Sequence, residues 1–151
     1  MIPDPEVLHA HCNLLNTSFT KLLGRPLVED TTSGSLVNQM LNAPFVIVSH
    51  NTENDPIFNF ANHCALNLWK MNWEEFTSLP SRYSAEAMER GQREAFLKQA
   101  QEKGYVDQYS GIRIAKDGKR FRISDAIIWN LHDDESNFKG QAATFNQWEY
   151  L

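Results

Sequence analysis

The chain has 151 residues, of which 42% are hydrophobic and 22% charged, and its formal net charge at pH 7 is −5. This length suits one domain with a buried core, and the composition is that of a globular protein. An acidic chain without clustered Lys and Arg is not expected to bind nucleic acid non-specifically. The longest purely apolar stretch, residues 43–48, is far too short to cross a bilayer, so no membrane is expected as a partner.

The start of the chain and its two cysteines predict the compartment. The first residues, MIPDPEV, lack the basic flank and the apolar run of a signal peptide. Without such a signal, Cys12 and Cys64 are typical of free thiols in a reducing environment. We therefore expect a cytoplasmic protein.

The first predicted element is a helix that starts after Asp4, because a carboxylate followed by proline is a common helix start. Gly24 is a natural stop. Apolar residues recur between them at spacings of four and three, which places them on one stripe. This stripe must lie against the body of the domain or against a second copy. We name it a candidate dimer interface: Leu8, Cys12, Leu15, Phe19 and Leu22.

Two short strands and several helices are predicted next. SGSLVNQMLNAP predicts a short helix that Pro44 ends, FVIVSHN a buried strand, and IFNFAN a second strand after a polar turn. From Cys64 onward the apolar spacing becomes helical. Residues 85–103 predict a charged, weakly amphipathic helix that ends at Gly104.

The C-terminal third predicts antiparallel strands. YVDQYSGIRIA and KRFRISDAIIWNLH flank Asp117-Gly118, a strong hairpin signal, and GQAATFNQW predicts a last strand. The element order predicts an α+β fold, a five-stranded antiparallel sheet with helices on one face and an N-terminal capping helix. Period 2 in the second hairpin strand places five side chains on one face: Phe121, Ile123, Ile127, Trp129 and Leu131.

This order resembles that of PAS domains, and IFNFANHCALNLWKMNWEEF is similar to the PAS pattern of a strand ending in Asn, a helix and an acidic helix. Longer stretches resemble the MEKHLA domain, a PAS-like family: VSHNTENDPIFNFAN, WEEFTSLPSRYSAE, GYVDQYSGIRIAKDGKRFRISDAIIWNL and GQAATFNQW. They cover about residues 45–148. We accordingly predict an N-terminal helical extension over residues 1–42 and a PAS-like MEKHLA domain over residues 43–151.

The family occurs as small bacterial proteins and at the C-terminus of plant class III homeodomain–leucine zipper proteins. The resemblance implies a regulatory or sensory module, and in the plant proteins a part that modulates dimerisation. PAS domains commonly pair through an N-terminal helix, so a homodimer is implied, and a separate, unidentified effector protein would provide the output. The homeodomain and the zipper are not in this sequence, so DNA binding does not carry over.

The adjacent residues Asn62, His63 and Cys64 raise the question of a reactive or metal-binding site. PAS photoreceptors that bond flavin use a cysteine in an NCRFLQ helix, and NHCALN lacks that arginine and glutamine. His63 and Cys64 face different ways on a helix, and a three-ligand site with His50 has no further support. We expect no metal, flavin or haem, a buried Cys64 thiol, and a structural Asn62 that ties the strand end to the next helix.

No catalytic constellation is recognisable. The sequence has no G-x-S-x-G, no paired Ser and Lys, no H-E-x-x-H and no glycine-rich loop after a strand. HDDE at 132–135 lacks the alternating ligands of a calcium loop. We therefore expect a protein that is not an enzyme.

A cavity between sheet and helices is the remaining candidate site, because PAS folds hold small molecules there. Two functions stay open: a sensor for a small apolar or carboxylate-bearing ligand that signals through a partner, or a ligand-free dimerisation module with a filled core. An inward Arg113 would favour a carboxylate, whereas a surface Arg113 would face acids across the ladder. The candidate lining residues, not all of which can face inward, are His50, Phe58, Asn59, Phe60, Trp69, Tyr109, Arg113, Ser124 and Trp129.

Overall fold

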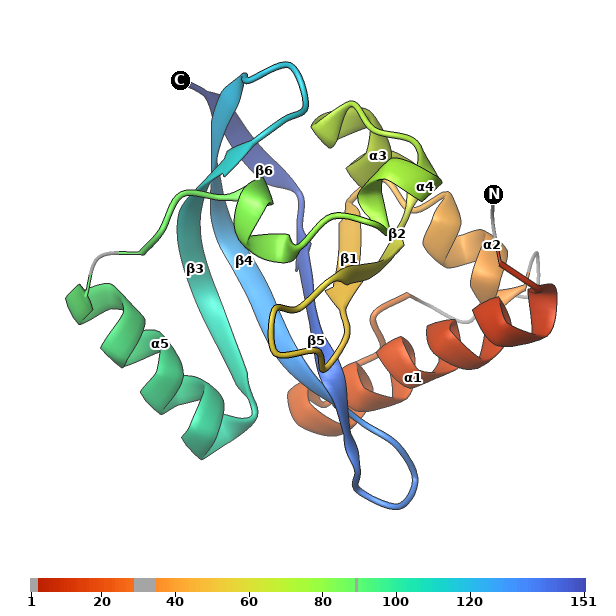
Figure 1. The fold of residues 1–151 in the computed structure, drawn as a ribbon. Coiled ribbons are helices and arrows are strands. Elements are labelled where there is room, and N and C mark those ends of the chain that lie inside the picture. Colours follow the sequence, from red (N-terminus) through yellow and green to blue (C-terminus); the bar gives the residue numbers. More distant parts are fainter. Residues whose placement is uncertain (1–2, 29–34, 89) are drawn as a thin grey trace.

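The structure, a computed structural model, describes residues 3–28, 35–88 and 90–151 (Figure 1). One antiparallel sheet has the strand order β2-β1-β5-β4-β3, and β6 pairs with β4 beyond the end of β5. The predicted α+β architecture is confirmed, with the last predicted strand divided into β5 and β6. The elements are α1 Pro5–Leu23, α2 Leu36–Leu41, β1 Val46–His50, β2 Phe58–Ala61, α3 His63–Trp69, α4 Trp73–Phe76, the 3-10 turn η1 Ser81–Ser84, α5 Arg90–Lys103, β3 Tyr105–Ile114, β4 Arg120–His132, β5 Phe138–Phe145 and β6 Gln147–Tyr150.

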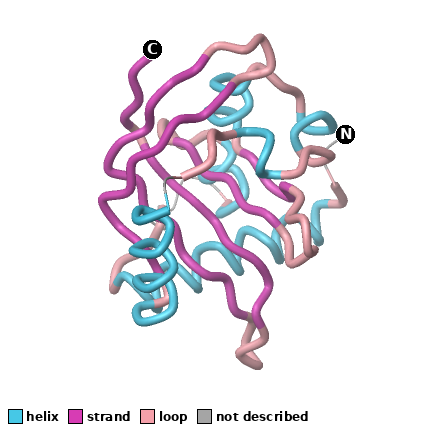
Figure 2. Tube along the Cα trace, turned by 60° about the vertical axis from the view of Figure 1, so that its left-hand side comes forward, coloured by secondary structure: helices cyan, strands magenta, loops and turns pink. Residues whose placement is uncertain are grey.

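Helix α1 starts and ends where the sequence predicts. The Glu6 amide donates to the carboxylate of Asp4 at 2.9 Å, and Gly24 closes the helix with φ of 76°. The helix packs on the opposite face of the sheet from α3, α4 and α5, so the strands lie between two helical layers (Figure 2). None of the described helices is long and apolar enough to cross a membrane.

The apolar stripe of α1 is buried within the chain. Cys12 and Leu15 have no exposed surface, and the Phe19 ring meets the Trp129 ring edge to face with centroids 4.9 Å apart. The structure therefore corrects the predicted dimer interface, because the stripe already covers one face of its own sheet and excludes water from it. The residues concerned are Leu8, Cys12, Leu15, Phe19 and the partly buried Leu22.

Two bulges interrupt the hairpin of β3 and β4. Gln108 has φ of 51° and adds a residue to β3, and Asp125 has φ of 55° and adds one to β4. Each bulge turns the following side chains over. Phe121 and Ile123 therefore face α3 and α5, and the prediction of one shared face is wrong for the side chains that face α1 after the bulge: Ile127, Trp129 and Leu131.

Two predicted helices start later than the sequence suggests. The helix predicted over 85–103 starts at Arg90, because the preceding segment pairs with the edge of β3, where the Glu86 amide donates to the Ile112 carbonyl at 3.0 Å. The earlier short helix starts after Ser35, whose hydroxyl caps it. Residues 33 and 34 of that prediction lie outside the described residues.

Asn62 connects three elements at the end of β2. Its side-chain oxygen accepts hydrogen bonds from the amides of Ile47 and Ala65, both at 3.1 Å. Its side-chain nitrogen donates to the carbonyls of Met40 at 3.0 Å and Phe45 at 2.8 Å. The residue has no exposed surface, so these bonds satisfy groups of α2, β1 and α3 that water cannot reach.

Replacing Leu15 with Asp should unfold the chain rather than separate a dimer. The carboxylate would enter an apolar site without a partner, and we expect a loss of more than about 3 kcal/mol of unfolding free energy. Val7→Asp is the matched control, because Val7 lies on the same helix and is 60% exposed. Urea unfolding followed by circular dichroism measures both, and equal midpoints would contradict the buried stripe.

Asn62→Ala should destabilise the fold by at least about 3 kcal/mol, because several buried backbone groups lose their only side-chain partner. Asn72→Ala removes an exposed cap of α4, where Asn72 Oδ1 accepts from the Glu75 amide at 2.8 Å, and should cost about 1 kcal/mol. The same urea titration compares the two. A loss at Asn62 no larger than at Asn72 would show that the buried bonds contribute little.

Candidate functional site

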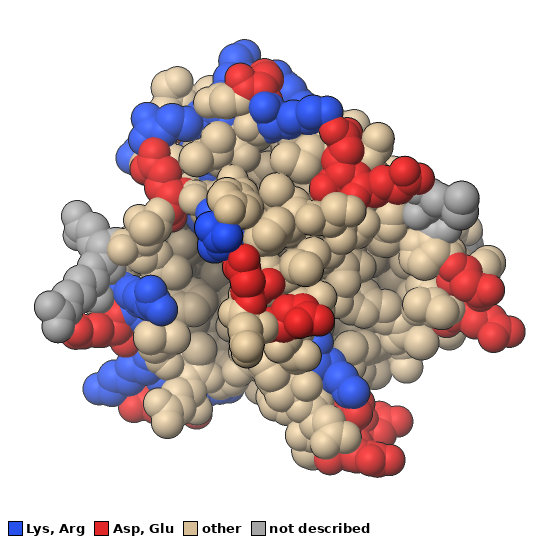
Figure 3. All heavy atoms as spheres, in the orientation of Figure 1, with Lys and Arg blue, Asp and Glu red and all other residues tan. Residues whose placement is uncertain are grey.

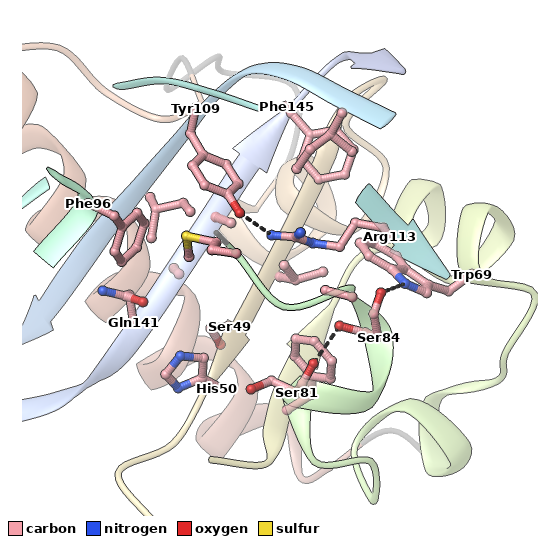
Figure 4. Close-up of a pocket in the computed structure, with 18 residues that line it drawn as sticks. Ser49, His50, Trp69, Ser81, Ser84, Phe96, Tyr109, Arg113, Gln141 and Phe145 are labelled. Atoms are coloured by element: carbon pink, nitrogen blue, oxygen red, sulfur yellow. Dashed lines mark hydrogen bonds between the residues drawn. The ribbon is translucent and has the colours of Figure 1, made fainter. Parts of the chain in front are cut away.

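A cavity of about 230 Å³ lies between the sheet and the helical layer of α3, η1 and α5. Strands β1, β3, β4 and β5 form one side of it, and its lining is mostly apolar with a few polar side chains (Figure 4). An apolar space with few polar groups is the usual form of a small-molecule site. Its larger apolar residues are Phe58, Trp69, Phe96, Ile123, Ile128 and Phe145.

Several predicted lining residues do line this cavity. They come from four different elements, which the fold brings together around one space. The residues are His50, Phe58, Trp69, Tyr109 and Arg113.

The other predicted lining residues lie elsewhere, and the prediction is wrong for them. Phe60 and Trp129 have no exposed surface and face α1. A register shift between β1 and β2 turns Phe60 away from the face of Phe58, and the β4 bulge does the same for Trp129. Asn59 is also on that side, where it accepts a hydrogen bond from the Ser49 hydroxyl at 2.5 Å. Ser124 pairs with Gln147 of β6 and does not line the cavity.

The cation of the cavity is the guanidinium of Arg113. Its Nη2 donates to the Tyr109 hydroxyl at 3.5 Å, and its carbon lies 5.5 Å from the centre of the Tyr109 ring. The residue opposite Arg113 on β4 is Phe121, so no acid faces it across the ladder. The ion pairs found within the described residues use other cations, which leaves the charge of Arg113 without a carboxylate partner there.

Gly111 makes room for the contact between Tyr109 and Arg113. Tyr109, Gly111 and Arg113 occupy every second position of β3 and share one face of the strand. The side chains of Tyr109 and Arg113 meet over the glycine. A Cβ at Gly111 would stand 2.6 Å from the Tyr109 hydroxyl oxygen and 2.9 Å from Arg113 Nη1. Any side chain there would displace the guanidinium, so the glycine sets the position of the charge.

A second polar end of the cavity offers hydrogen-bond acceptors. His50 Nδ1 lies 2.9 Å from the Asn51 carbonyl oxygen, which can only accept, so in the neutral imidazole Nδ1 carries the proton and Nε2 keeps a lone pair. The side-chain N–H of Gln141 donates to Asn130 Oδ1 at 3.1 Å, which leaves the Gln141 side-chain oxygen as an acceptor. His50 and Gln141 are direct neighbours across β1 and β5.

A separate polar cluster lies beneath α1, on the other face of the sheet. The Ser49 hydroxyl donates to Asn59, and His11 Nε2 lies 2.8 Å from the Ser49 oxygen, so that nitrogen carries a proton. Burial lowers the pKa of His11 from 6.5 to about 4, and the imidazole is therefore neutral at pH 7. A proton-donating imidazole cannot act as a base on Ser49, so this cluster does not activate a nucleophile.

The two thiols are not placed for chemistry in the cavity. Burial raises the pKa of Cys12 to about 12 and also raises the pKa of Cys64. Cys64 packs against the core and does not line the cavity, and His63 beside it is exposed. The residues present thus do not fit a flavin bonded through Cys64. In the part of the chain that the structure describes, no three His, Cys, Asp or Glu side chains gather as metal ligands would.

The sequence matches the family model of the MEKHLA domain over residues 9–150. The chain belongs to the MEKHLA domain family. The match begins within α1, so the family pattern includes most of the helix that covers the sheet. A boundary between residues 42 and 43 of this MEKHLA protein stays a prediction. None of the curated proteins compared with the chain matches it.

Solved structures similar to this MEKHLA protein are PAS domains. A PAS domain of a Colwellia psychrerythraea protein has a TM-score of 0.59 and 12% identity over 76% of this chain and 92% of that one. A light-oxygen-voltage domain studied with a flavin analogue has a TM-score of 0.58 and 18% identity, covering 79% and 86%. The light-state dimer of the fungal blue-light photoreceptor Vivid has a TM-score of 0.56 and 11% identity, covering 85% and 90%. At these identities the likeness shows a shared PAS fold.

Some lining residues were not predicted. Gln141, Ala143 and Phe145 alternate along GQAATF, so period 2 would have found them once one of them was known to face inward. Met88 lies in an irregular segment and Ser84 at the end of the short turn η1, and neither is long enough for a periodicity to mark the inward side.

Protonation of His11 should destabilise this MEKHLA protein at mildly acidic pH. The pKa is about 4 in the folded chain and near 6.5 in the unfolded one, so the unfolded state binds the proton first. The contribution of neutral His11 to the free energy of unfolding is fully present above pH 6.5. It is lost as the pH falls from 6.5 to 4, by up to about 3 kcal/mol.

His11→Gln should flatten this pH dependence, because glutamine still donates to Ser49 but does not titrate. His9→Gln is the control, since His9 is exposed on the same helix. The test compares the pH dependence of the unfolding free energy, measured in urea between pH 7 and pH 4, for the wild type and the two variants. A slope that is the same in wild type and His11→Gln would exclude His11 as its source.

Proposed function

We propose that this MEKHLA protein is a non-catalytic sensory domain that binds a small apolar or carboxylate-bearing molecule between its sheet and helices. The observation that supports this is a cavity of about 230 Å³ that contains an arginine without a carboxylate partner among the described residues. A fully packed core would leave no such space. Sites for drug-sized ligands span roughly 300–1,000 Å³, so a smaller molecule with one or two rings suits this one.

Signalling would pass through β1 to α1 and then to an effector protein. Val48 and His50 line the cavity, and Ser49 between them bonds His11 of α1. A ligand that shifts β1 would therefore change the contact beneath α1 and the outer surface that the helix presents. The same strand thus supports a physical route from ligand to partner.

A homodimer is part of the proposal, on a surface other than the buried stripe. The similarity to a light-state dimer supports it, and so do exposed apolar side chains such as Leu97 and Phe138. The same likeness also supports the alternative function, a ligand-free interaction module. For that function, light scattering would detect a dimer of the protein that contains no bound ligand. Both cysteines are free thiols, which supports the proposed cytoplasmic location.

Native mass spectrometry of the freshly purified chain, compared with its denatured mass, tests ligand binding. We expect one extra mass per chain that is lost on denaturation. Ala143→Phe should abolish it, because Ala143 lies at the centre of the cavity floor between Val48 and Ile128. Ala95→Phe is the control, since Ala95 is exposed on α5.

A ligand retained equally by Ala143→Phe and wild type would contradict a site in this cavity. Circular dichroism establishes that both variants are folded. A bare mass for the wild type, together with no uptake of small aromatic probes at millimolar concentration, would contradict the sensor and favour the interaction module.

A further inference from the structure

The two polar ends of the cavity differ in whether their side chains donate or accept hydrogen bonds. At one end, Arg113 presents a cation and Tyr109 a hydroxyl that accepts from it and keeps its own proton to donate. At the other end, the Gln141 side-chain oxygen accepts, and so does His50 Nε2 when the imidazole is neutral. A molecule that satisfies both ends carries an anion on one side and a hydrogen-bond donor on the other.

These ends lie at different levels of the sheet. Arg113 pairs with Phe121 on β4, whereas Gln141 pairs with Asn130 further along the same strand. Figure 4 shows His50 and Gln141 close together and apart from Arg113. The Arg113 side chain turns back over Gly111, which narrows the gap, but the two ends still lie at separate positions along the strands, so an occupant that reaches both is elongated rather than compact.

The space between the ends is apolar and suits a flat ring. Ala143 forms its floor between Val48 and Ile128, and its small side chain leaves room above the sheet. Phe96 packs against the Tyr109 ring with centroids 5.6 Å apart and closes the cavity from the α5 side. Aromatic and aliphatic walls of this kind favour an aromatic body.

The surroundings of the opening favour an anion. A shallow groove on the outside shares Met88, Phe96, Tyr109 and Arg113 with the cavity. It adds Arg93, and also Arg82 and Glu86, whose charges are paired with Asp55 and Arg120, so Arg93 and Arg113 are the cations in excess there. The rest of the surface seen in Figure 3 carries interspersed acidic and basic groups, and the chain as a whole is acidic. An excess of cations beside one opening raises the local concentration of anionic ligands.

We infer that the ligand is an elongated, hydroxylated aromatic carboxylic acid. Its carboxylate lies at Arg113 and Tyr109, its ring lies over Ala143, and its hydroxyl donates to His50 Nε2 and the Gln141 oxygen. This inference rests on the proposed function and specifies the class of ligand for the same cavity.

Isothermal titration calorimetry with 3-(4-hydroxyphenyl)propanoate and three analogues tests the inference. The primary amide lacks the charge, 3-phenylpropanoate lacks the hydroxyl, and 4-propylphenol lacks the carboxylate. We expect the amide to bind about 10- to 100-fold more weakly than the acid and 3-phenylpropanoate roughly 3- to 10-fold more weakly, from the usual strengths of charged and neutral hydrogen bonds. Ala143→Phe should prevent binding of all of them.

Variants of the protein locate the charge. Arg113→Met should weaken binding of the acid at least about 10-fold and leave binding of the amide almost unchanged. Arg122→Met is the matched control, because Arg122 is an exposed arginine of the neighbouring strand that does not line the cavity. Gly111→Ala keeps the guanidinium but displaces it, and should also weaken binding of the acid more than binding of the amide.

The outcomes separate this inference from the proposed function. If acid, amide and 4-propylphenol bind alike and Ala143→Phe blocks them, the cavity binds ligands but the inferred class is wrong. If neither the acid nor 4-propylphenol binds at millimolar concentration, both the class and the ligand-binding function fail. Should Arg113→Met not fold, the comparison of acid and amide on the wild type still decides.

Discussion

The fold depends on one buried amide. Asn62 satisfies backbone groups of α2, β1 and α3 at once, and without it these groups would be enclosed with no partner. It aligns the start of β1, and β1 in turn pairs with β5, which places His50 beside Gln141 at one end of the cavity. It also starts α3, at whose end Trp69 meets Phe121 and Phe145 and forms a wall of the same cavity.

The two faces of the sheet are used differently. The face under α1 is closely packed, with the His11 and Ser49 contact as a polar exception and the buried indole N–H of Trp129 without a partner among the described groups. The opposite face keeps a space above Ala143. In the proposed function, a molecule that enters the unfilled layer would shift β1, and because β1 also contacts α1 through Ser49 the shift would reach the packed layer.

Local signals predicted much of this structure. The caps of α1, the turn at Asp117-Gly118 and the role of Asn62 follow from residues close in sequence, and Tyr109 and Arg113 were both among the predicted lining residues. Phe60 and Trp129 were predicted to line the cavity but lie on the other face, because their side depends on the register with neighbouring strands and on bulges. Gln108 and Asp125 adopt positive φ without being glycine, and residue type alone does not mark such positions. The late start of α5 likewise depends on pairing with β3, which is distant in sequence.

The paired bulges restrict how the chain can change in length. Between Val106 and Gly111 the extra residue of β3 is matched by one in β4, so the register before and after them is the same. A residue gained or lost in one strand alone would shift the register of the hairpin. The shift would disrupt either the pairing next to the turn or the pairing of β4 with β5. Insertions and deletions here should therefore arise in compensating pairs. The position of Arg113 in the cavity is thus determined by the relative lengths of two strands as much as by the arginine itself.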